Sequence, residues 1–260
     1  MKISVVTVSR NAAGTIEETL RSVRSQNYPQ VEHIVVDGGS DDGTVEIIER
    51  YRDRIAGFVS EPDRGIYDAM NKGIAMASGE VVGTLNADDV YADETVLSQV
   101  AQVFSDPDVD ACYADLLYVD PQNPGKIVRY WRSCEYRPGL FEKGWMPAHP
   151  TFFVRRDMYA KWGGYDPGFP RQADFELTMR FLAIHRLRSV YVPRVWVLMH
   201  TGGVSNRSLA GILKGNIEAY RACKKNRLRV NVLFIPRKLL SRVPQFFARP
   251  ATTHGYASRS

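Results

Sequence analysis

Short apolar runs alternate with amphipathic segments along the first ninety residues of the chain. The runs are rich in β-branched side chains and almost continuously apolar, which favours strands buried on both faces: residues 3–8 (ISVVTV), 33–37 (HIVVD), 57–60 (GFVS) and 80–85 (EVVGTL). Between them, apolar side chains recur at helical spacing and predict helices over residues 16–23, 45–52 and 66–77. Thr15 and Glu18 have the spacing of a capping box at the first helix.

Strands and helices that alternate in units of this length predict an α/β fold with a doubly wound, mostly parallel sheet. The second half is less regular. Residues 96–103 and 175–182 predict helices, and residues 110–120 and 126–131 predict two strands paired across a turn at Pro124-Gly125. A last strand over residues 189–200 contains Pro193, which favours a sheet edge. We therefore expect a mixed, partly antiparallel second half followed by C-terminal helices.

Composition sets the broad class of the protein. With 260 residues, of which 44% are hydrophobic and 24% charged, the chain can bury one main core. Its three cysteines, Cys112, Cys134 and Cys223, are far apart, so a disulfide framework or thiolate zinc site is not expected. No segment has the pattern of a signal peptide or a membrane span. We expect a cytoplasmic protein.

Charge is distributed unevenly. The net charge is +5, yet Glu218 is the last acidic residue and ten Lys and Arg residues follow it. The part before the tail is therefore acidic, and a nucleic-acid-binding protein is not expected. Apolar residues between Leu209 and Tyr220 outline an amphipathic helix, and an apolar, basic stretch follows. This tail can lie peripherally on the anionic inner face of the cell membrane, or it can dock on the main domain.

Three polar clusters follow predicted strands. They are Ser9-Arg10-Asn11, the glycine-rich and aspartate-rich residues 37–43, and Asn86-Ala87-Asp88-Asp89. Ligands of a doubly wound sheet bind beyond the carboxyl ends of its strands, so three clusters at one rim favour a ligand site. The alternative is that these residues only form turns and helix caps.

The clusters are acidic and lack both the Gly-x-Gly-x-x-Gly pattern and a Gly-Lys-Ser/Thr loop, so neither a dinucleotide site nor a P-loop is expected. Asp37 could accept hydrogen bonds from a base or ribose. Asp88 and Asp89 could hold a divalent cation against the oxygens of a diphosphate, which would make that diphosphate a good leaving group.

A second pair of carboxylates, Asp174 and Glu176 in QADFELTMRF, offers a general base. On a helix these two side chains point to different sides, so one can face the cleft while the other is solvated. The alternative for Asp174 is a helix cap.

Together, the segments ISVVTVSRN, VVDGGSDDGT, SEPDRGIYDAMNKGIAMASGE and LNADD resemble the inverting family-2 glycosyltransferases with the GT-A fold. HPTFFVRRDMYAKWGGYD and ADFELTMRF resemble acceptor-side segments of the branch that builds bacterial surface polysaccharides, including colanic-acid type enzymes. The resemblance spans about the first 205 residues and implies a nucleotide-sugar half (1–91), an acceptor half (92–205) and a basic extension (206–260).

The resemblance implies a metal-dependent transfer, with Mn²⁺ or Mg²⁺, from a nucleotide diphosphate sugar such as a UDP-sugar to a saccharide or lipid-linked acceptor. It assigns Asp174 as general base and Asp88 as metal ligand, with Asp89 beside it and His200 completing the metal or pyrophosphate site. The donor would contact Ser9, Asn11, Asp37, Arg64 and Asn86.

Two positions depart from the family's pattern, because Asn86 and Ala173 stand where many relatives have acidic residues. An amide can still hydrogen-bond a hydroxyl, so we expect Asn86→Asp to be tolerated. Trp145 and His149 are placed on the acceptor side by the resemblance, and core packing is the alternative for Trp145. A nucleotidyltransferase and a non-catalytic nucleotide-sugar-binding protein are the alternative functions.

Overall fold

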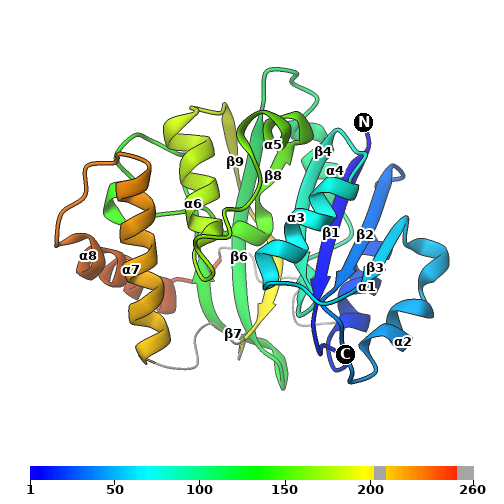
Figure 1. Cartoon of the computed structure of the whole chain (residues 1–260). Coiled ribbons are helices and arrows are strands. Elements are labelled where there is room, and N and C mark those ends of the chain that lie inside the picture. The colour runs from blue at the N-terminus through cyan, green and yellow to red at the C-terminus, as the bar shows by residue number, and fades with distance from the viewer. Residues whose placement is uncertain (202–208, 251–260) are drawn as a thin grey trace.

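The computed structural model describes residues 1–201 and 209–250 (Figure 1). Four parallel strands in the order β3–β2–β1–β4 form the first half of the sheet: β1 (Ile3–Ser9), β2 (Val31–Asp37), β3 (Gly57–Ser60) and β4 (Val81–Asn86). These are the four strands that the apolar runs predict. Connecting helices are α1 (Ile16–Arg24), α2 (Thr44–Glu49) and α3 (Ile66–Met76), with a 3₁₀ turn, η1 (Arg52–Arg54), after α2.

Helices cover both faces of this half. Val35 of β2 belongs to an apolar cluster with Ile16 and Leu20 of α1, whereas its neighbour Val36 belongs to the main core with Met70 of α3. Successive residues of a strand point to opposite faces, so β2 is buried on both. The doubly wound arrangement is therefore confirmed.

Helix α3 lies unusually close to β1. A Cβ atom at Gly73 would be 2.2 Å from Cγ1 of Val6, so no larger residue fits without displacing the helix. In such a β-α unit the helix begins beyond the carboxyl end of the preceding strand. The close packing thus fixes the first turn of α3, which carries Tyr67, beside the rim of the sheet.

The second half is mixed, as predicted. Strand β8 (Phe153–Arg155) runs antiparallel between β4 and β6 (Ala111–Asp120), and β9 (Ser189–His200) is parallel to β6. Strand β5 (Asp89–Tyr91) is antiparallel to β9, and β7 (Asn123–Trp131) is antiparallel to β6. Figure 1 shows this half beside the first, with α5 (Arg156–Trp162) in front of the sheet. Helix α4 (Val96–Val103) lies near the end of α1, where the backbone N–H of Leu97 donates to Gln26 Oε1.

Three local predictions need correction. Strand β7 already begins at Asn123, opposite Asp120, so the turn lies at residues 121–122 and the predicted Pro124-Gly125 turn is wrong. The capping box is absent, since the side chain of Thr15 makes no capping hydrogen bond. Helix α2 ends at Glu49, because the chain tightens into the 3₁₀ turn η1 before the predicted end at residue 52.

Pro193 lies where β9 departs from its partner. Val192 pairs with Ala114 and Val195 pairs with Asp115, so Pro193 and Arg194 form a bulge. On its other side β9 pairs with β5 only at Val197–Met199. Because proline has no N–H group, it could not have formed a hydrogen bond to a neighbouring strand here. At Pro193 strand β9 is locally unpaired, in agreement with the edge position that the sequence predicts.

The remaining segments pack around the second half of the sheet. They are η2 (Phe141–Lys143), η3 (His149–Thr151), α6 (Ala173–Met179), the π-helical turn η4 (Arg180–Ile184), α7 (Leu209–Lys225), α8 (Phe234–Leu240) and η6 (Val243–Phe246). Helix α7 confirms the predicted tail helix, but it buries Asn216, Ala219 and Cys223 while exposing Leu213 and Ile217. None of the described helices is long and apolar enough to span a bilayer.

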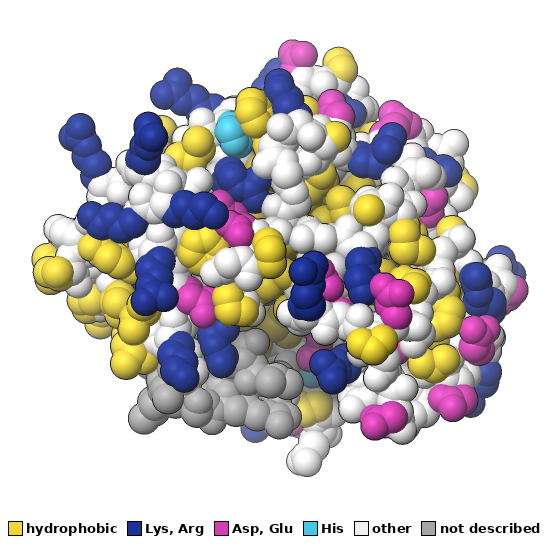
Figure 2. All heavy atoms as spheres, in the orientation of Figure 1, with side chains coloured by type: hydrophobic (Ala, Val, Ile, Leu, Met, Phe, Trp, Pro, Cys, Tyr) yellow, Lys and Arg dark blue, Asp and Glu magenta, His cyan; other side chains and the backbone are white. Residues whose placement is uncertain are grey.

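The surface reflects the uneven charge of the sequence. Figure 2 shows Lys and Arg side chains gathered on the left of this face, where Figure 1 places α6 and α7, and many Asp and Glu side chains toward the right. The acidic side lies over the first half of the chain and the basic side over its second half.

Candidate active site

The carboxyl ends of β1, β2 and β4 bring the three predicted polar clusters together. Ser9 is in register with Asp37, and Val8 is in register with Asn86 on the other side of β1. The last residues of all three strands therefore lie side by side at one rim. This is the rim at which a doubly wound sheet binds its ligands.

Asp37 organises the first two loops. Its side chain is fully buried and accepts hydrogen bonds from the hydroxyls of Ser9 (2.9 Å), Ser40 and Ser60 (2.8 Å), and from the backbone N–H groups of Gly39 and Ser40. Burial alone would raise the pKa of this carboxyl, but the hydrogen bonds from these serines lower it below its usual value. A base or ribose would have to replace one of the donors that Asp37 already uses.

Asn11 joins the loops after β1 and β2. Its backbone is left-handed, with φ of 50°, a conformation in which asparagine is enriched. Its backbone N–H donates to Ser40 Oγ (2.8 Å), and its Oδ1 accepts the backbone N–H of Asp41 (3.1 Å). Asn11 thus shapes the rim.

Arg64 lies just before α3. Its side chain is 84% exposed and pairs with Asp68 at 2.9 Å. An exposed pair of this kind contributes little stability, so the guanidinium can leave Asp68 for a bound phosphate at small cost.

The turn between β4 and β5 separates two neighbouring aspartates. Asp89 is fully buried at the start of β5, and its Oδ2 accepts a hydrogen bond from Asn86 Nδ2 at 3.0 Å. Burial, together with the charge of Asp88, raises the pKa of Asp89 well above its usual range. Asp89 points into the protein and supports the turn, whereas the sequence analysis placed it at the cation.

Asp88 is the half-buried member of the pair. Burial raises the pKa of its carboxyl, while the charges of His200 and His149 act in the opposite direction. His200, at the end of β9, also has its Nε2 atom 4.0 Å from Glu18 Oε2. In residues 1–201 and 209–250 no three His, Cys, Asp or Glu side chains converge on one point, so Asp88, Asp89 and His200 do not form a preassembled ligand set.

Several polar atoms around Asp88 are left without partners. Within the described part of the chain, Asn86 Oδ1, Asp89 Oδ1 and His149 Nδ1 are buried and make no hydrogen bond. Buried polar atoms are normally paired, so unpaired groups beside Asp88 are compatible with a ligand site there. The Asp88 carboxylate fits a hard cation such as Mn²⁺ or Mg²⁺ whose other ligands are phosphate oxygens and water.

Asp174 lies in the first turn of α6, with 9% of its surface exposed. Its Oδ1 accepts hydrogen bonds from the hydroxyl of Tyr67 (3.0 Å) and from the backbone N–H of Phe175 (2.8 Å). Its Oδ2 lies 3.2 Å from His149 Nδ1, although the two atoms are not aligned for a hydrogen bond. Burial lowers the pKa of His149 against the opposing effect of Asp174, which favours a neutral imidazole.

Tyr67 is a residue of the site that the sequence analysis missed. Its ring stacks on Tyr165 with centroids 5.3 Å apart. One turn later on α3, Asn71 donates to the backbone carbonyl of Tyr165 and accepts its N–H, both at 2.8 Å. The i, i+4 spacing of Tyr67 and Asn71 is the only signal in the sequence that these two side chains face the same partner, Tyr165.

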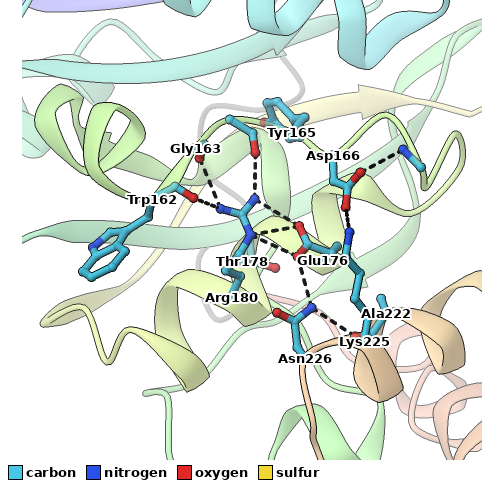
Figure 3. Close-up of polar contacts among 12 residues, drawn as sticks. Trp162, Gly163, Tyr165, Asp166, Glu176, Thr178, Arg180, Ala222, Lys225 and Asn226 are labelled. Carbon is cyan, nitrogen blue, oxygen red and sulfur yellow. Dashed lines mark hydrogen bonds and ion pairs between the residues drawn. The ribbon is translucent and has the colours of Figure 1, made fainter.

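Glu176 does not face solvent, so the prediction of a solvated carboxylate is wrong. It is 1% exposed and accepts Arg180 Nε at 3.0 Å and Asn226 Nδ2 at 3.1 Å (Figure 3). Arg180 also donates to the carbonyls of Trp162, Gly163 and Gly164. This network fastens α6, and with it Asp174, to the preceding loop and to the end of α7.

Trp145 packs in an aromatic cluster with Tyr113, Tyr136 and Phe141, at centroid distances of 5.4 to 6.0 Å. These contacts favour the alternative that Trp145 packs in the core, rather than stacking on the ring of a bound sugar. The aromatic side chain next to the predicted acceptor residue His149 is Trp131, whose ring meets the imidazole edge-on at 6.3 Å. Trp131 lies on β7, and nothing in its sequence context distinguishes it from a core residue.

Comparison with known proteins agrees with this geometry. The sequence model described as glycosyl transferase family 2 matches residues 4–163. The chain is 35% identical over 183 residues to an uncharacterised glycosyltransferase of Mycobacterium tuberculosis, a match that covers 68% of each chain. It is 27% identical over 207 residues to the PGL/p-HBAD biosynthesis glycosyltransferase of that species, covering 78% of each chain.

Two solved structures share the fold. One is S. aureus TarS 1–349 in complex with UDP, with a TM-score of 0.66 and 19% identity over 100% of this chain and 75% of that one. The other is a mannosyltransferase from Pyrobaculum calidifontis in complex with GDP-Man and Mn²⁺. It has a TM-score of 0.64 and 22% identity, and the match covers 93% of this chain and 69% of that one.

Proposed function

Since the chain belongs to glycosyl transferase family 2 and is a glycosyltransferase, we propose that it transfers one sugar, with inversion, from a nucleotide diphosphate sugar to an acceptor hydroxyl. UDP is the nucleotide we assign. The observation that carries this proposal is the enclosure of Asp174 by Tyr67 and His149, because among the described residues one carboxylate oxygen, Oδ2, receives no hydrogen bond.

Asp174 acts as the general base in this proposal. Oδ1 is held by two donors, so Oδ2 accepts the proton of the acceptor hydroxyl. The hydroxyl oxygen then forms its bond to the anomeric carbon as the bond to the nucleoside diphosphate breaks on the opposite face. A single displacement of this kind inverts the configuration. The neighbouring His149, held neutral by burial, adds no positive charge that would oppose proton uptake.

The donor lies at the rim formed by Ser9, Asn11 and Asp37 in this proposal, with its phosphates toward Asp88 and Arg64. A divalent cation bound there would neutralise charge on the leaving diphosphate, an effect worth several kcal/mol. Asp88 would hold the cation, and His200 is one of the two histidines that act electrostatically on the Asp88 carboxyl. Asp89 and Asn86 keep the turn of Asp88 in place through their hydrogen bond.

The acceptor we propose is a saccharide or lipid-linked sugar of a bacterial cell-surface polysaccharide. The C-terminal segment supports a peripheral position on the inner face of the membrane, because it exposes large apolar side chains beside its basic ones. Val232 is 84% exposed, Leu240 67% and Phe247 81%. Apolar side chains that alternate with Lys and Arg are typical of surfaces that lie on anionic lipid.

Family membership argues against the two alternatives, a nucleotidyltransferase and a non-catalytic binder. Calorimetry with UDP, UDP-sugars and GDP-sugars, each with and without Mn²⁺, tests the proposal. We expect one nucleotide sugar to bind, and we expect Asp88→Asn to remove the dependence of its affinity on Mn²⁺. Affinity that is unchanged by chelation in the parent protein would refute the metal-diphosphate account.

A further inference from the structure

The short helix α8 buries a lysine. Phe234 and Lys238 are each 1% exposed, and their i, i+4 spacing places them on the same side of the helix. Leu239 and Leu240, which follow Lys238, are 42% and 67% exposed. Lysine is rarely buried to this extent, because removing its amine from water costs free energy that an apolar side chain would not cost. Packing alone therefore does not explain why a lysine occupies position 238.

Both buried side chains of α8 contact the beginning of α6, which carries Asp174. The Nζ atom of Lys238 donates to Gln172 Oε1 at 2.8 Å and lies 4.5 Å from the ring centroid of Phe175. The ring of Phe234 packs edge-on against Phe175, with centroids 6.2 Å apart. Lys238 therefore contacts the residue two positions before the proposed base and the residue directly after it.

The two residues that Lys238 contacts hold Asp174 through the backbone. The carbonyl of Gln172 accepts the N–H of Glu176 at 3.0 Å, a hydrogen bond of the first turn of α6. The N–H of Phe175 donates to Asp174 Oδ1 at 2.8 Å. A displacement of Gln172 would therefore disturb the turn from which the side chain of Asp174 projects.

Helix α7 holds the same segment from a second direction, and Figure 1 shows it beside α6. Glu218 Oε2 accepts the backbone N–H of Arg171 at 2.9 Å. Arg171 and Gln172 are the last two residues before α6, so each of them is bound by a side chain from the C-terminal helices. These helices are therefore in direct contact with the support of the proposed base.

The position of Lys238 is itself fixed by close packing. A Cβ atom at Gly144 would be 2.4 Å from Cβ of Lys238 and 2.7 Å from its Cα, so a larger residue at 144 would displace α8. Burial lowers the pKa of Lys238 to about 7. The charged ammonium and the neutral amine both carry N–H donors, so the hydrogen bond to Gln172 is available in either protonation state.

We propose that Lys238 is a positioning residue for the reaction, which acts through Gln172 to hold the first turn of α6 and with it Asp174. This role rests on the proposed function of Asp174 as general base, whereas the effect of Lys238 on the α6 turn does not. A membrane contact made by the exposed side of α8 would not require a buried lysine on its other side. The C-terminal segment therefore contributes to catalysis in addition to any contact with lipid.

Lys238→Met tests this role, because methionine has a similar length and no N–H donor. We expect kcat to fall about fivefold, the effect of one hydrogen bond on the position of the base. The KM for the nucleotide sugar should be unchanged, since Lys238 contacts α6 and not the rim of Ser9 and Asp37. Lys214→Met is the matched control, because Lys214 is exposed on α7. Equal kcat values for Lys238→Met, Lys214→Met and the parent chain would overturn the proposal.

Two measurements separate positioning from a general loss of stability. Urea unfolding should find Lys238→Met at least as stable as the parent, since methionine has no amine to remove from water. Gln172→Leu should also lower kcat, and adding Lys238→Met to it should lower kcat no further, because the two residues act as one unit. Independent losses that multiply in the double variant would show that Lys238 does not act through Gln172.

Hydrogen exchange provides a readout that does not depend on sugar transfer. The backbone amides of Phe175 and Glu176 should exchange faster in Lys238→Met than in the parent, whereas those of β1 should not change. An active Asp174→Asn variant would contradict the general base itself. An inactive Asp174→Asn variant, together with unchanged exchange and unchanged kcat in Lys238→Met, would overturn only the role of Lys238.

Discussion

The hydroxyl of Tyr67, in the first turn of α3, donates a hydrogen bond of 3.0 Å to Oδ1 of Asp174, in the first turn of α6. The two residues are 107 positions apart and belong to different halves of the chain. The first half of the chain therefore positions the proposed base, which lies in the second half, through a direct contact. Tyr67 is a positioning residue in this account.

Tyr67→Phe should lower kcat about tenfold, because the carboxylate loses one charge-assisted hydrogen bond. The KM for the nucleotide sugar should be unchanged, since Tyr67 holds Asp174 and does not contact the donor in this account. Steady-state kinetics with one sugar donor provides the measurement. Tyr28→Phe is the matched control, as the hydroxyl of Tyr28 donates to the backbone carbonyl of Met1 and to no described residue of the site. A rise in KM with unchanged kcat would contradict the positioning role.

Asn86→Asp should destabilise the protein, contrary to the expectation from sequence. Asn86 Nδ2 donates to Asp89 Oδ2 inside the protein, and an aspartate at position 86 has no N–H to donate and would place a second acidic group beside the buried Asp89 carboxyl. We expect a loss of about 1–3 kcal/mol in the free energy of unfolding, measured with urea in the presence of a chelator. Asn27→Asp makes the same change at an exposed position and serves as control. Equal stability of Asn86→Asp and Asn27→Asp would show that the hydrogen bond between Asn86 and Asp89 does not contribute to stability.

His33 should make stability depend on pH. Burial lowers the pKa of His33 to about 4, and its Nε2 lies 2.9 Å from Thr7 Oγ1. A histidine whose pKa is lowered in the fold contributes stability that is present above the unfolded pKa of about 6.5 and is lost as the pH falls toward 4.

Over that range the loss should be about 3 kcal/mol, since each pKa unit corresponds to about 1.4 kcal/mol. Urea unfolding between pH 7 and pH 4 measures this loss, and His33→Gln should show a flatter dependence because it removes the titrating group. If the free energy of unfolding depends on pH equally in the parent and in His33→Gln, His33 is not the group that causes the loss of stability.

Much of the first half of the fold could be predicted from the sequence. Strands such as residues 57–60 are apolar runs between helical patterns, and parallel strands then place Ser9, Asp37 and Asn86 at one rim. This inference needs only periodicity and the rule that ligands lie beyond the carboxyl ends of the strands. Asp174 and Glu176 were both candidates for the base from their residue type, and the family resemblance assigned that role to Asp174.

Directions of side chains could not be predicted in the same way. Asp88 and Asp89 are neighbours in sequence, and only the turn between β4 and β5 determines that Asp89 points inward. Glu176 is buried because Arg180 and Asn226, from distant segments, supply its partners. Long-range contacts of this kind leave no periodic pattern, so Tyr67 and Trp131 were missed.

The most direct test of the account is sugar transfer by Asp174→Asn, measured together with donor binding. The account predicts that the affinity for the nucleotide sugar with Mn²⁺ stays within about twofold of the parent. It also predicts that kcat falls at least a hundredfold, the contribution expected of a general base. A folded Asp174→Asn protein that retains kcat within about tenfold of the parent would contradict the claim that Asp174 takes the proton of the acceptor.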